Sequence, residues 1–398
     1  SFPTRRSSDL RSLSTILKNM RLRRGAIDFD FPEYKVILDP EGVPLRLEKR
    51  ERTIAEQIVE ESMLIANETV ACYLRDSENP SVYRIHELPE PERLEMMRTV
   101  LSSFNLPMPD TEAVKPADFQ KLLEMTKGTD EAAVVQTIAL RSMQQARYST
   151  TNAGHFGLAS ECYTHFTSPI RRYPDLMVHR LIRQYQRRGK LTEEESQQSL
   201  SYHTIASDQA SSRERIAVEA ERETDDLKKC QYMLPFIGQP FEAHITGITS
   251  FGLFVGLENG IEGLVHISLL TDDDYEFDEA SYTLRGQHGG KVYRLGDAME
   301  VTLAQVNVEK CEIDFVPGRY ESLEDVQQLM AASAERRHKR KHSDKKDTDT
   351  KRNWFAGAIG KKGKKDKKDK KGRKEKKSGR KAARKGKGRK SRGKKKKK

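Results

Sequence analysis

The chain has 398 residues and a formal net charge of +12, but this charge is distributed unevenly. Residues 336–398 contain 34 Lys/Arg against 6 Asp/Glu, a net charge of +28, which leaves residues 1–335 at −16. An acidic body does not attract nucleic acid through its overall field. Any nucleic-acid binding by the body must therefore depend on local basic surface and on stacking.

Cysteine usage and hydropathy exclude several classes of protein. The four cysteines are scattered and form no CxxC pair, which argues against a disulfide framework and a zinc site and favours a reducing compartment. No apolar run approaches the roughly 18 residues that a membrane span needs. We therefore expect a cytoplasmic protein with no membrane partner.

The first ten residues, SFPTRRSSDL, stand apart from the rest. They lack the apolar core of a signal peptide, and no periodicity links them to the residues after Leu10. Because the chain also has no initiator Met, we expect residues 1–10 to be a non-native leader and the natural protein to begin upstream.

The first elements follow from periodicity. Apolar spacing predicts a helix over Arg11–Arg24, and alternation of Ile27, Phe29 and Phe31 with Asp28 and Asp30 predicts a strand over Ala26–Phe31. Further along, a DPEG turn predicts a hairpin with strands at Tyr34–Leu38 and Leu45–Leu47. An apolar stretch without Gly or Pro then predicts a mostly buried helix over Arg52–Arg75.

The middle of the chain is predicted to be mainly helical. Short amphipathic helices are expected at Pro91–Leu101, Lys115–Lys127 and Asp130–Gln145, followed by loop and strand over Ala153–Phe166. The segment SPIRRYPD then opens a helix that runs to Gly189, with Pro174 in its first turn. A long polar helix is expected over Thr192–Leu234, where a hinge could fall around Tyr202–Ser207.

After Ile237 the pattern changes to short β-rich runs separated by Gly or Asp. Such runs fill Phe241–Val316 and predict a small barrel. A short helix is expected at Ser322–Glu335, followed by a Lys/Arg-rich tail that is too polar to bury a core. The fold class is therefore α+β, then an all-β barrel, then a disordered tail.

The segment Tyr163–Arg180, YTHFTSPIRRYPDLMVHR, carries the most specific chemistry. Two adjacent arginines precede a helix, where guanidinium groups and helix N–H groups can both face a phosphate. A bare arginine pair is more often a surface feature that pairs with nearby carboxylates. Here the whole string resembles the late signature of the RNB family, the exoribonuclease II and ribonuclease R type.

The resemblance runs from about Leu13 to Gly318. RRGAIDFD, IVEESMLIANETVA and ARYSTTNAGHFGLA, which begin at Arg23, Ile58 and Ala146, are similar to family motifs in the family's order. It implies that an arginine of SPIRR contacts the scissile phosphate at the bottom of an RNA-threading cavity beside a carboxylate helix. The resemblance assigns this phosphate contact to Arg171, with Arg172 as the second candidate.

The resemblance also gives roles to three other residues. Phe29 corresponds to an aromatic that clamps the 3′-terminal base, although a core-facing strand residue is equally consistent. Glu61 corresponds to a carboxylate at the terminal ribose, since a glutamate buried in an apolar helix needs a partner. Glu221 corresponds to a late glutamate near the catalytic centre, with a solvated face as the alternative.

Family chemistry implies hydrolysis assisted by two Mg²⁺ ions that an aspartate cluster holds. That cluster belongs to an earlier motif, so we expect the metal ligands upstream of this chain, none within it, and little activity from this chain alone. Asp28 and Asp30 match the hairpin motif instead. Asp272, Asp273 and Asp274 are read as a solvated loop.

Residues Gly247–Leu270, GITSFGLFVGLENGIEGLVHISLL, strongly resemble an S1 domain, an OB-fold barrel that binds single-stranded RNA. Phe251, Phe254 and His266 are candidates for base stacking, which is typically worth about 1–3 kcal/mol per base. Phe254 carries the greatest risk of being a core residue. Arg294, in YRLGD, is a candidate phosphate contact.

The predicted organisation places a leader at 1–10, the C-terminal part of an RNB domain at 11–234, an S1 domain at 235–318, a short linker helix at 319–335 and the basic tail at 336–398. The tail favours electrostatic contacts with RNA or ribosomes. The leading hypothesis is a processive hydrolytic 3′-to-5′ exoribonuclease that releases nucleoside 5′-monophosphates from single-stranded and structured RNA. A non-catalytic S1 RNA-binding protein and a phosphorolytic enzyme are the alternatives.

Overall fold

The computed structural model describes residues 2–29, 33–107, 114–129, 131–278 and 281–343. The basic tail after Ser343 lies outside the described residues, as do Asp30 and Phe31 of the expected first strand. Within the described part of the chain, no helix combines the length and apolar character needed to cross a membrane.

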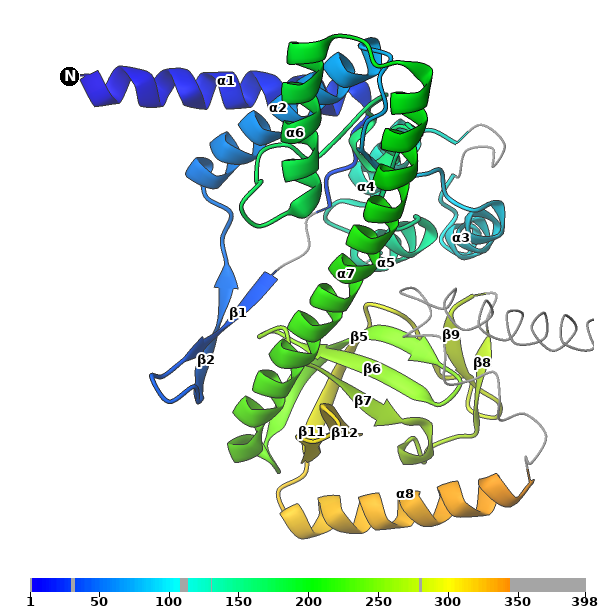
Figure 1. The fold of residues 1–398 in the computed structure, drawn as a ribbon. Coiled ribbons are helices and arrows are strands. Elements are labelled where there is room, and N and C mark those ends of the chain that lie inside the picture. Colours follow the sequence, from blue (N-terminus) through cyan, green and yellow to red (C-terminus); the bar gives the residue numbers. More distant parts are fainter. Residues whose placement is uncertain (1, 30–32, 108–113, 130, 279–280, 344–398) are drawn as a thin grey trace, which may run out of the picture. The chain divides into compact units, whose positions relative to one another are not determined.

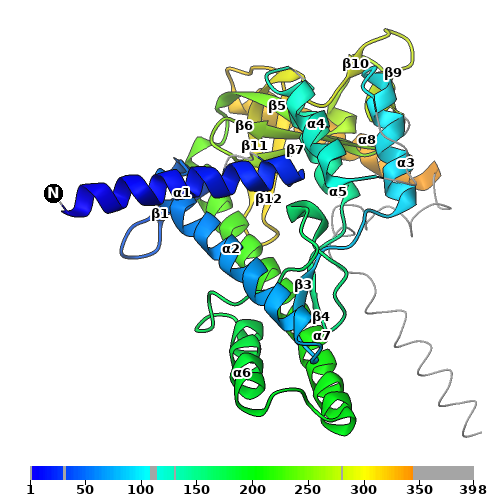
Figure 2. The same ribbon diagram turned by 90° about the horizontal axis from the view of Figure 1, so that it is seen from above.

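Helix α1 (Phe2–Arg24) begins inside the segment that was predicted to be a leader. It lies against α2 (Ile54–Asp76), as Figure 2 shows. Two ion pairs join these helices: Arg21 Nη2 lies 2.8 Å from Glu61 Oε1, and Arg24 Nη2 lies 2.5 Å from Glu68 Oε1.

The predicted strand over Ala26–Phe31 is wrong for the residues that can be described. Ala26–Phe29 is irregular, because its backbone bonds to a loop instead of a strand ladder: Ile27 N–H donates to the Gly157 carbonyl over 2.9 Å. Ile27 is nonetheless buried in the core. The hairpin prediction is confirmed, since β1 (Glu33–Leu38) pairs antiparallel with β2 (Pro44–Arg50).

Helix α2 starts at a capping box in which Thr53 and Glu56 satisfy each other's backbone N–H groups. The expectation that this helix is mostly buried is wrong. Its buried residues are Glu61, Asn67, Ala71 and Leu74, whereas Val59 is 52% exposed. One face of α2 therefore stays open, and the candidate site forms along it.

Three expected helices are confirmed as α3 (Pro91–Ser103), α4 (Pro116–Thr126) and α5 (Ala132–Ser142). They pack around an apolar core that includes Met97, Phe119 and Val135. A short two-stranded sheet pairs β3 (Tyr83–Ile85) with β4 (Arg147–Ser149). A 3₁₀ turn follows at Phe156–Leu158.

Helix α6 (Tyr173–Arg188) carries Pro174 in its first turn, as predicted. Helix α7 (Glu193–Met233) runs for 41 residues without a break, so the hinge suggested around Tyr202–Ser207 is absent. Small buried serines let this helix pack closely on β4: Ser207 is 1% exposed, and Ser211 Oγ accepts the Tyr148 N–H over 2.9 Å. Figure 1 shows α7 as a single continuous rod.

The predicted barrel is confirmed. Five strands close in the order β11-β12-β7-β6-β5, with an apolar interior that includes Leu253, Val265 and Phe315. The barrel strands span Pro240–Thr249 (β5), Gly252–Leu257 (β6), Glu262–His266 (β7), Ala298–Asn307 (β11) and Glu312–Pro317 (β12). Gly252 is required where β6 approaches β7, because a Cβ there would lie 2.3 Å from the Val265 carbonyl oxygen.

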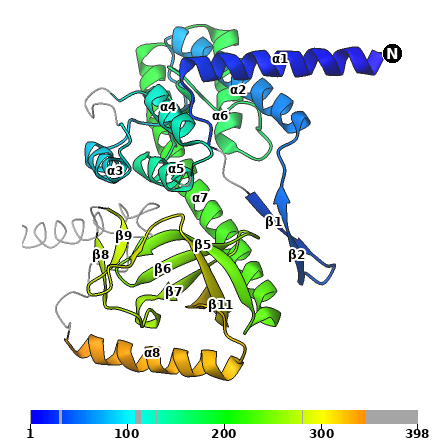
Figure 3. The same cartoon turned by 180° about the vertical axis from the view of Figure 1, so that it is seen from behind.

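Three further strands and one helix accompany the barrel, as Figure 3 shows from behind. The small sheet comprises β8 (Tyr275–Asp278), β9 (Thr283–Gly286) and β10 (Val292–Tyr293). Helix α8 (Leu323–Ser343) extends past the predicted end at Glu335 and packs through Val326 on the barrel.

Candidate active site

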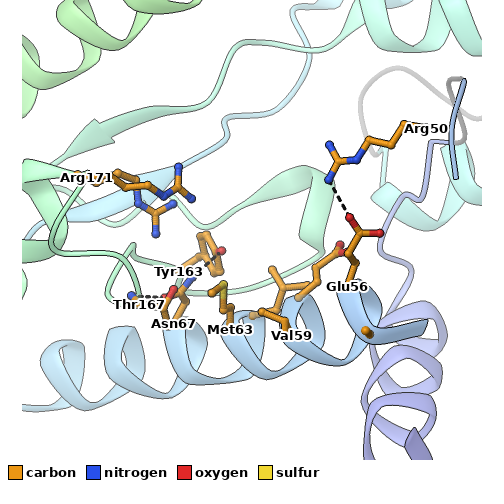
Figure 4. Close-up of a pocket in the computed structure, with 12 residues that line it drawn as sticks. Arg50, Glu56, Val59, Met63, Asn67, Tyr163, Thr167 and Arg171 are labelled. Atoms are coloured by element: carbon orange, nitrogen blue, oxygen red, sulfur yellow. Dashed lines mark hydrogen bonds and ion pairs between the residues drawn. The ribbon is translucent and has the colours of Figure 1, made fainter. Parts of the chain in front are cut away.

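A cavity of about 560 Å³ opens between α2 and the loop that leads into α6 (Figure 4). Its α2 wall is largely apolar, and its loop wall is polar. The apolar lining on α2 comprises Ala55, Val59, Met63 and Leu64, next to the polar Asn67, and the loop wall comprises Tyr163, Thr167, Arg171 and Arg172. A ligand in this cavity would meet aliphatic surface on one side and two guanidinium groups on the other.

Asn67 fastens the loop to α2. Its Nδ2 donates to the Tyr163 hydroxyl over 2.9 Å, and its Oδ1 accepts the N–H groups of Phe166 and Thr167 over 3.0 and 3.3 Å. The side chain is 3% exposed, so its polar groups depend on these partners. The segment before SPIRR is thereby fixed to the cavity wall.

The two arginines differ in freedom. Arg172 Nη2 donates to Asp175 Oδ1 over 2.8 Å, and Asp175 is fully buried. Arg171 is exposed, and within the described part of the chain it makes no hydrogen bond or ion pair. The structure thus separates two neighbours that the sequence could not: Arg171 is available to an anion, whereas Arg172 is held in place.

Helix α6 adds a further feature at this end of the cavity. Arg172 is its N-cap residue and gives it no side-chain cap. The N-terminus of a helix carries partial positive charge and unpaired N–H groups, which favour anions. Both features act with the arginines to favour a phosphate.

Two carboxylates stand toward the other end of the cavity, where Figure 4 shows Arg50 and Glu56. Glu56 Oε1 accepts from Arg50 over 3.0 Å, and Glu60 forms an ion pair with Arg52. The backbone N–H of Thr53 and the Arg50 guanidinium lower the pKa of Glu56 to about 2. These pairs leave the unneutralised positive charge at the Arg171 end.

The wall behind Tyr163 consists of aromatic rings in edge-to-face contact. The rings of His155 and His165 lie 5.2 and 5.7 Å from that of Tyr163, and His165 Nδ1 lies 2.8 Å from the Tyr148 hydroxyl. Burial lowers the pKa of His155 to about 3 and that of His165 to about 2. Both imidazoles are neutral near pH 7 and act as packing elements.

Three other predicted residues lie elsewhere. Glu61 is buried in its pair with Arg21 and does not line the cavity, although its predecessor Glu60 does. Phe29 packs, half-buried, against the apolar core, and Glu221 is exposed on α7. The structure does not bring Arg171, Glu61 and Glu221 together, and the roles of these residues remain predictions.

Three residues of the site, Tyr163, Thr167 and Asp175, were not predicted from the sequence. A signal for Asp175 existed, since an acid in the first turn of a helix beside two arginines favours an ion pair. Tyr163 and Thr167 gave no such signal, because their place depends on contacts with Asn67, about 100 residues earlier in the chain.

On the barrel, Phe251 and Phe254 are both half-buried, with ring centroids 5.9 Å apart at 86°. His266 Nδ1 lies 2.7 Å from the Ser268 hydroxyl, and the Arg294 side chain is exposed. Neither phenylalanine belongs to the fully buried barrel interior. Their proposed contact with bases remains a prediction.

The described residues do not form a metal centre. No three His, Cys, Asp or Glu side chains among them gather closely enough to hold an ion. Asp273, in the loop of three aspartates, is instead saturated by the loop itself: its carboxylate accepts the N–H groups of His288 and Gly289. We derive no step through a metal from these residues.

Comparison with known families agrees with this architecture. The RNB domain model matches residues 4–188, and the S1 RNA binding domain model matches residues 234–316. The chain thus joins a segment that matches the RNB family to an S1 barrel.

Within that family, the relatives are of the ribonuclease R type. Ribonuclease R of Aquifex aeolicus is 43% identical over 307 residues, which cover 77% of this chain and 43% of that protein. Ribonuclease R of Escherichia coli K12 is 38% identical over 314 residues, with 77% and 39% covered. The chain thus spans about two fifths of the length of these relatives.

Solved structures show the same likeness. The apo form of Mycoplasma genitalium RNase R superimposes with a TM-score of 0.73 at 28% identity, covering 78% of this chain and 49% of that one. The same values hold for that enzyme in complex with ribose methylated single-stranded RNA.

Proposed function

We propose that this chain is part of a processive, hydrolytic 3′-to-5′ exoribonuclease of the ribonuclease R type, which releases nucleoside 5′-monophosphates from RNA. One observation carries the proposal: the unpaired Arg171 and the held Arg172 face one cavity at the start of α6. Guanidinium groups bind phosphate in fixed geometry, and the opposite apolar wall suits a base and its sugar.

In that reaction, the residues of this chain would bind and orient the RNA. Arg171 would contact a phosphate, and Arg172 would offer its remaining donors from a fixed position. Val59 and Met63 would exclude water beside the nucleotide. The proposal includes Mg²⁺, which would polarise the phosphate and supply a nucleophilic water, held by carboxylates that are not among the described residues.

The S1 barrel and the basic tail would add contacts to single-stranded and structured RNA, and the tail could also reach ribosomes. Stacking on Phe251 and Phe254 would hold RNA without sequence preference. The S1 match and the RNA-bound relative support this part of the proposal.

The alternative is an S1-domain RNA-binding protein without nuclease activity. The absence of a metal-binding cluster among the described residues is expected under both readings, so an aspartate cluster upstream in the reading frame is what separates them. Under either reading we expect the 398-residue chain by itself to degrade RNA slowly or not at all in Mg²⁺.

The first test measures binding of a short single-stranded RNA to the full chain and to Arg171→Ala. We expect Arg171→Ala to weaken binding about tenfold, the typical loss for a charge-assisted phosphate contact. Arg187→Ala, which removes an exposed arginine near the C-terminal end of α6, outside the cavity, is the matched control. Equal affinity for the chain and both variants would refute the proposed role of the cavity.

The second test separates the function classes by product. The chain preceded by the part of a ribonuclease R relative that lies upstream of the matched residues should release nucleoside monophosphates without inorganic phosphate. Release that requires phosphate would indicate phosphorolysis, and RNA binding without any release would favour the non-catalytic alternative.

A further inference from the structure

The loop that carries the arginines is anchored from both sides by Asn67 and Asp175. Asn67 holds its start, at Phe166 and Thr167. Asp175 holds its end, because Asp175 Oδ1 accepts both the Ser168 N–H and the Arg172 guanidinium over 2.8 Å each. Between these anchors Ile170 is fully exposed, so the tip of the loop has no other support there.

Both anchors are buried and polar. Asn67 is 3% exposed and Asp175 is 0% exposed. A buried carboxylate or amide is costly unless its partners are in place, and a core position at either site could be filled by an aliphatic residue. Instead, Asn67 Oδ1 and Asp175 Oδ1 both accept backbone N–H groups of one loop.

A third contact supports the same loop without facing the cavity. His179 Nε2 lies 2.9 Å from the Phe166 carbonyl oxygen, and the two rings stack 4.1 Å apart. The Arg172 N–H also donates to the Ser168 carbonyl over 3.1 Å, which closes the turn. The loop is thus held in one conformation before any ligand arrives.

We propose that Asn67 and Asp175 are positioning residues: they fix the two ends of the loop over residues 166–172 and so hold Arg171 and Arg172 at the cavity. This inference rests on the proposed function, since it concerns how the same cavity binds RNA phosphate. Pre-organised donors lose less conformational freedom on binding. Removing an anchor should therefore weaken RNA binding although neither anchor is proposed to contact RNA.

The test is a double-mutant cycle on the full 398-residue chain, with a short fluorescent single-stranded RNA at about 0.3 M salt, where distant electrostatic contacts are screened. We expect Asn67→Ala to weaken binding about tenfold, as Arg171→Ala does, and the double variant to be little weaker than either single one. In both single variants and in the double variant, the slope of log affinity against log salt should decrease by about 1, the change expected for the loss of one phosphate contact.

Asn79→Ala is the matched control. Asn79 is also a buried asparagine, 8% exposed, and its Oδ1 accepts the Leu191 N–H over 3.0 Å, away from the cavity. A purely structural loss lowers the fraction of active protein but leaves the affinity and salt dependence of the folded fraction unchanged. We expect Asn79→Ala to show only that loss.

Asp175→Asn provides a second variant in case Asn67→Ala folds poorly. It keeps an oxygen at the Oδ1 position but removes the charge that holds Arg172, and we expect about threefold weaker binding. Wild-type affinity for Asn67→Ala and Asp175→Asn, with Arg171→Ala weakened, would overturn this inference alone, as would fully additive effects in the cycle. An unaffected Arg171→Ala would overturn the proposed function as well.

Discussion

Arg21 and Glu61 form a buried ion pair that joins α1 to α2, with Nη2 and Oε1 2.8 Å apart and side chains 7% and 2% exposed. The sequence pointed to the cost of burying Glu61, and the family resemblance suggested a ribose partner. In the structure an arginine of this chain supplies the compensating charge.

This pair predicts a large stability effect. We expect Glu61→Ala to lower the free energy of unfolding by about 3–5 kcal/mol, because it leaves the Arg21 charge buried without compensation. The double change Arg21→Met with Glu61→Leu should restore most of that loss. Urea unfolding measures both; a stable Glu61→Ala chain with weakened RNA binding would favour the ribose role instead.

The buried imidazoles predict how stability depends on pH. The pKa values of His155 and His165 are lowered to about 3 and about 2 by burial, against an unfolded value of about 6.5. At pH values between the folded and the unfolded pKa, the unfolded chain binds more protons than the folded chain. The stability that is present above about pH 6.5 is therefore lost as the pH falls.

We expect the loss to approach about 1.4 kcal/mol per pH unit for each histidine. Denaturant unfolding from about pH 7.5 to about pH 5 measures it. His165→Gln should flatten the slope by about one proton. An equal slope in the wild-type chain and His165→Gln would contradict the assignment.

The barrel predicts stacking losses. Phe251→Ala and Phe254→Ala should each weaken binding of single-stranded RNA by about 1–3 kcal/mol, since both residues are only half-buried. Titration with unstructured RNA checks this, with thermal unfolding run in parallel to show that the barrel is intact. An effect on stability without one on affinity would make the residue a packing element.

The tail predicts salt dependence. Deleting residues 344–398 removes 29 Lys/Arg and 6 Asp/Glu and leaves α8 whole. We expect weaker RNA binding and a flatter dependence of affinity on salt, because fewer counterions are released. A cut at residue 336, where the sequence placed the boundary, would also remove the last part of α8. A salt slope equal to that of the full chain would contradict the role of the tail.

Much of the fold could be predicted because its signals are local. The hairpin at Asp39–Gly42, the capping box before α7 and the alternating barrel strands each depend on neighbours a few residues apart. The strand predicted over Ala26–Phe31 failed for Ala26–Phe29, because this segment bonds to the Phe156–Leu158 turn and not to a strand. The sequence pattern alone did not show which partner its backbone would find.

The site was predicted only in part, for a similar reason. The SPIRR arginines stand out in the sequence, but which of them is held depends on Asp175 and on the turn geometry. The open face of α2 could not be foreseen, because Val59 and Met63 have the composition of core residues. Only the path of the loop, fixed through Asn67, shows that they line a cavity.

Ser268 connects two parts of the barrel that lie far apart in the sequence. Its hydroxyl lies 2.7 Å from His266 Nδ1 and also bonds to the hydroxyl of Ser333 on α8. A barrel that is cut at Val316, the last residue of the S1 match, would lose Ser333, whose hydroxyl bonds to Ser268, and Val326, which packs on Val316. Shortened versions that serve as RNA probes should extend through Ser343.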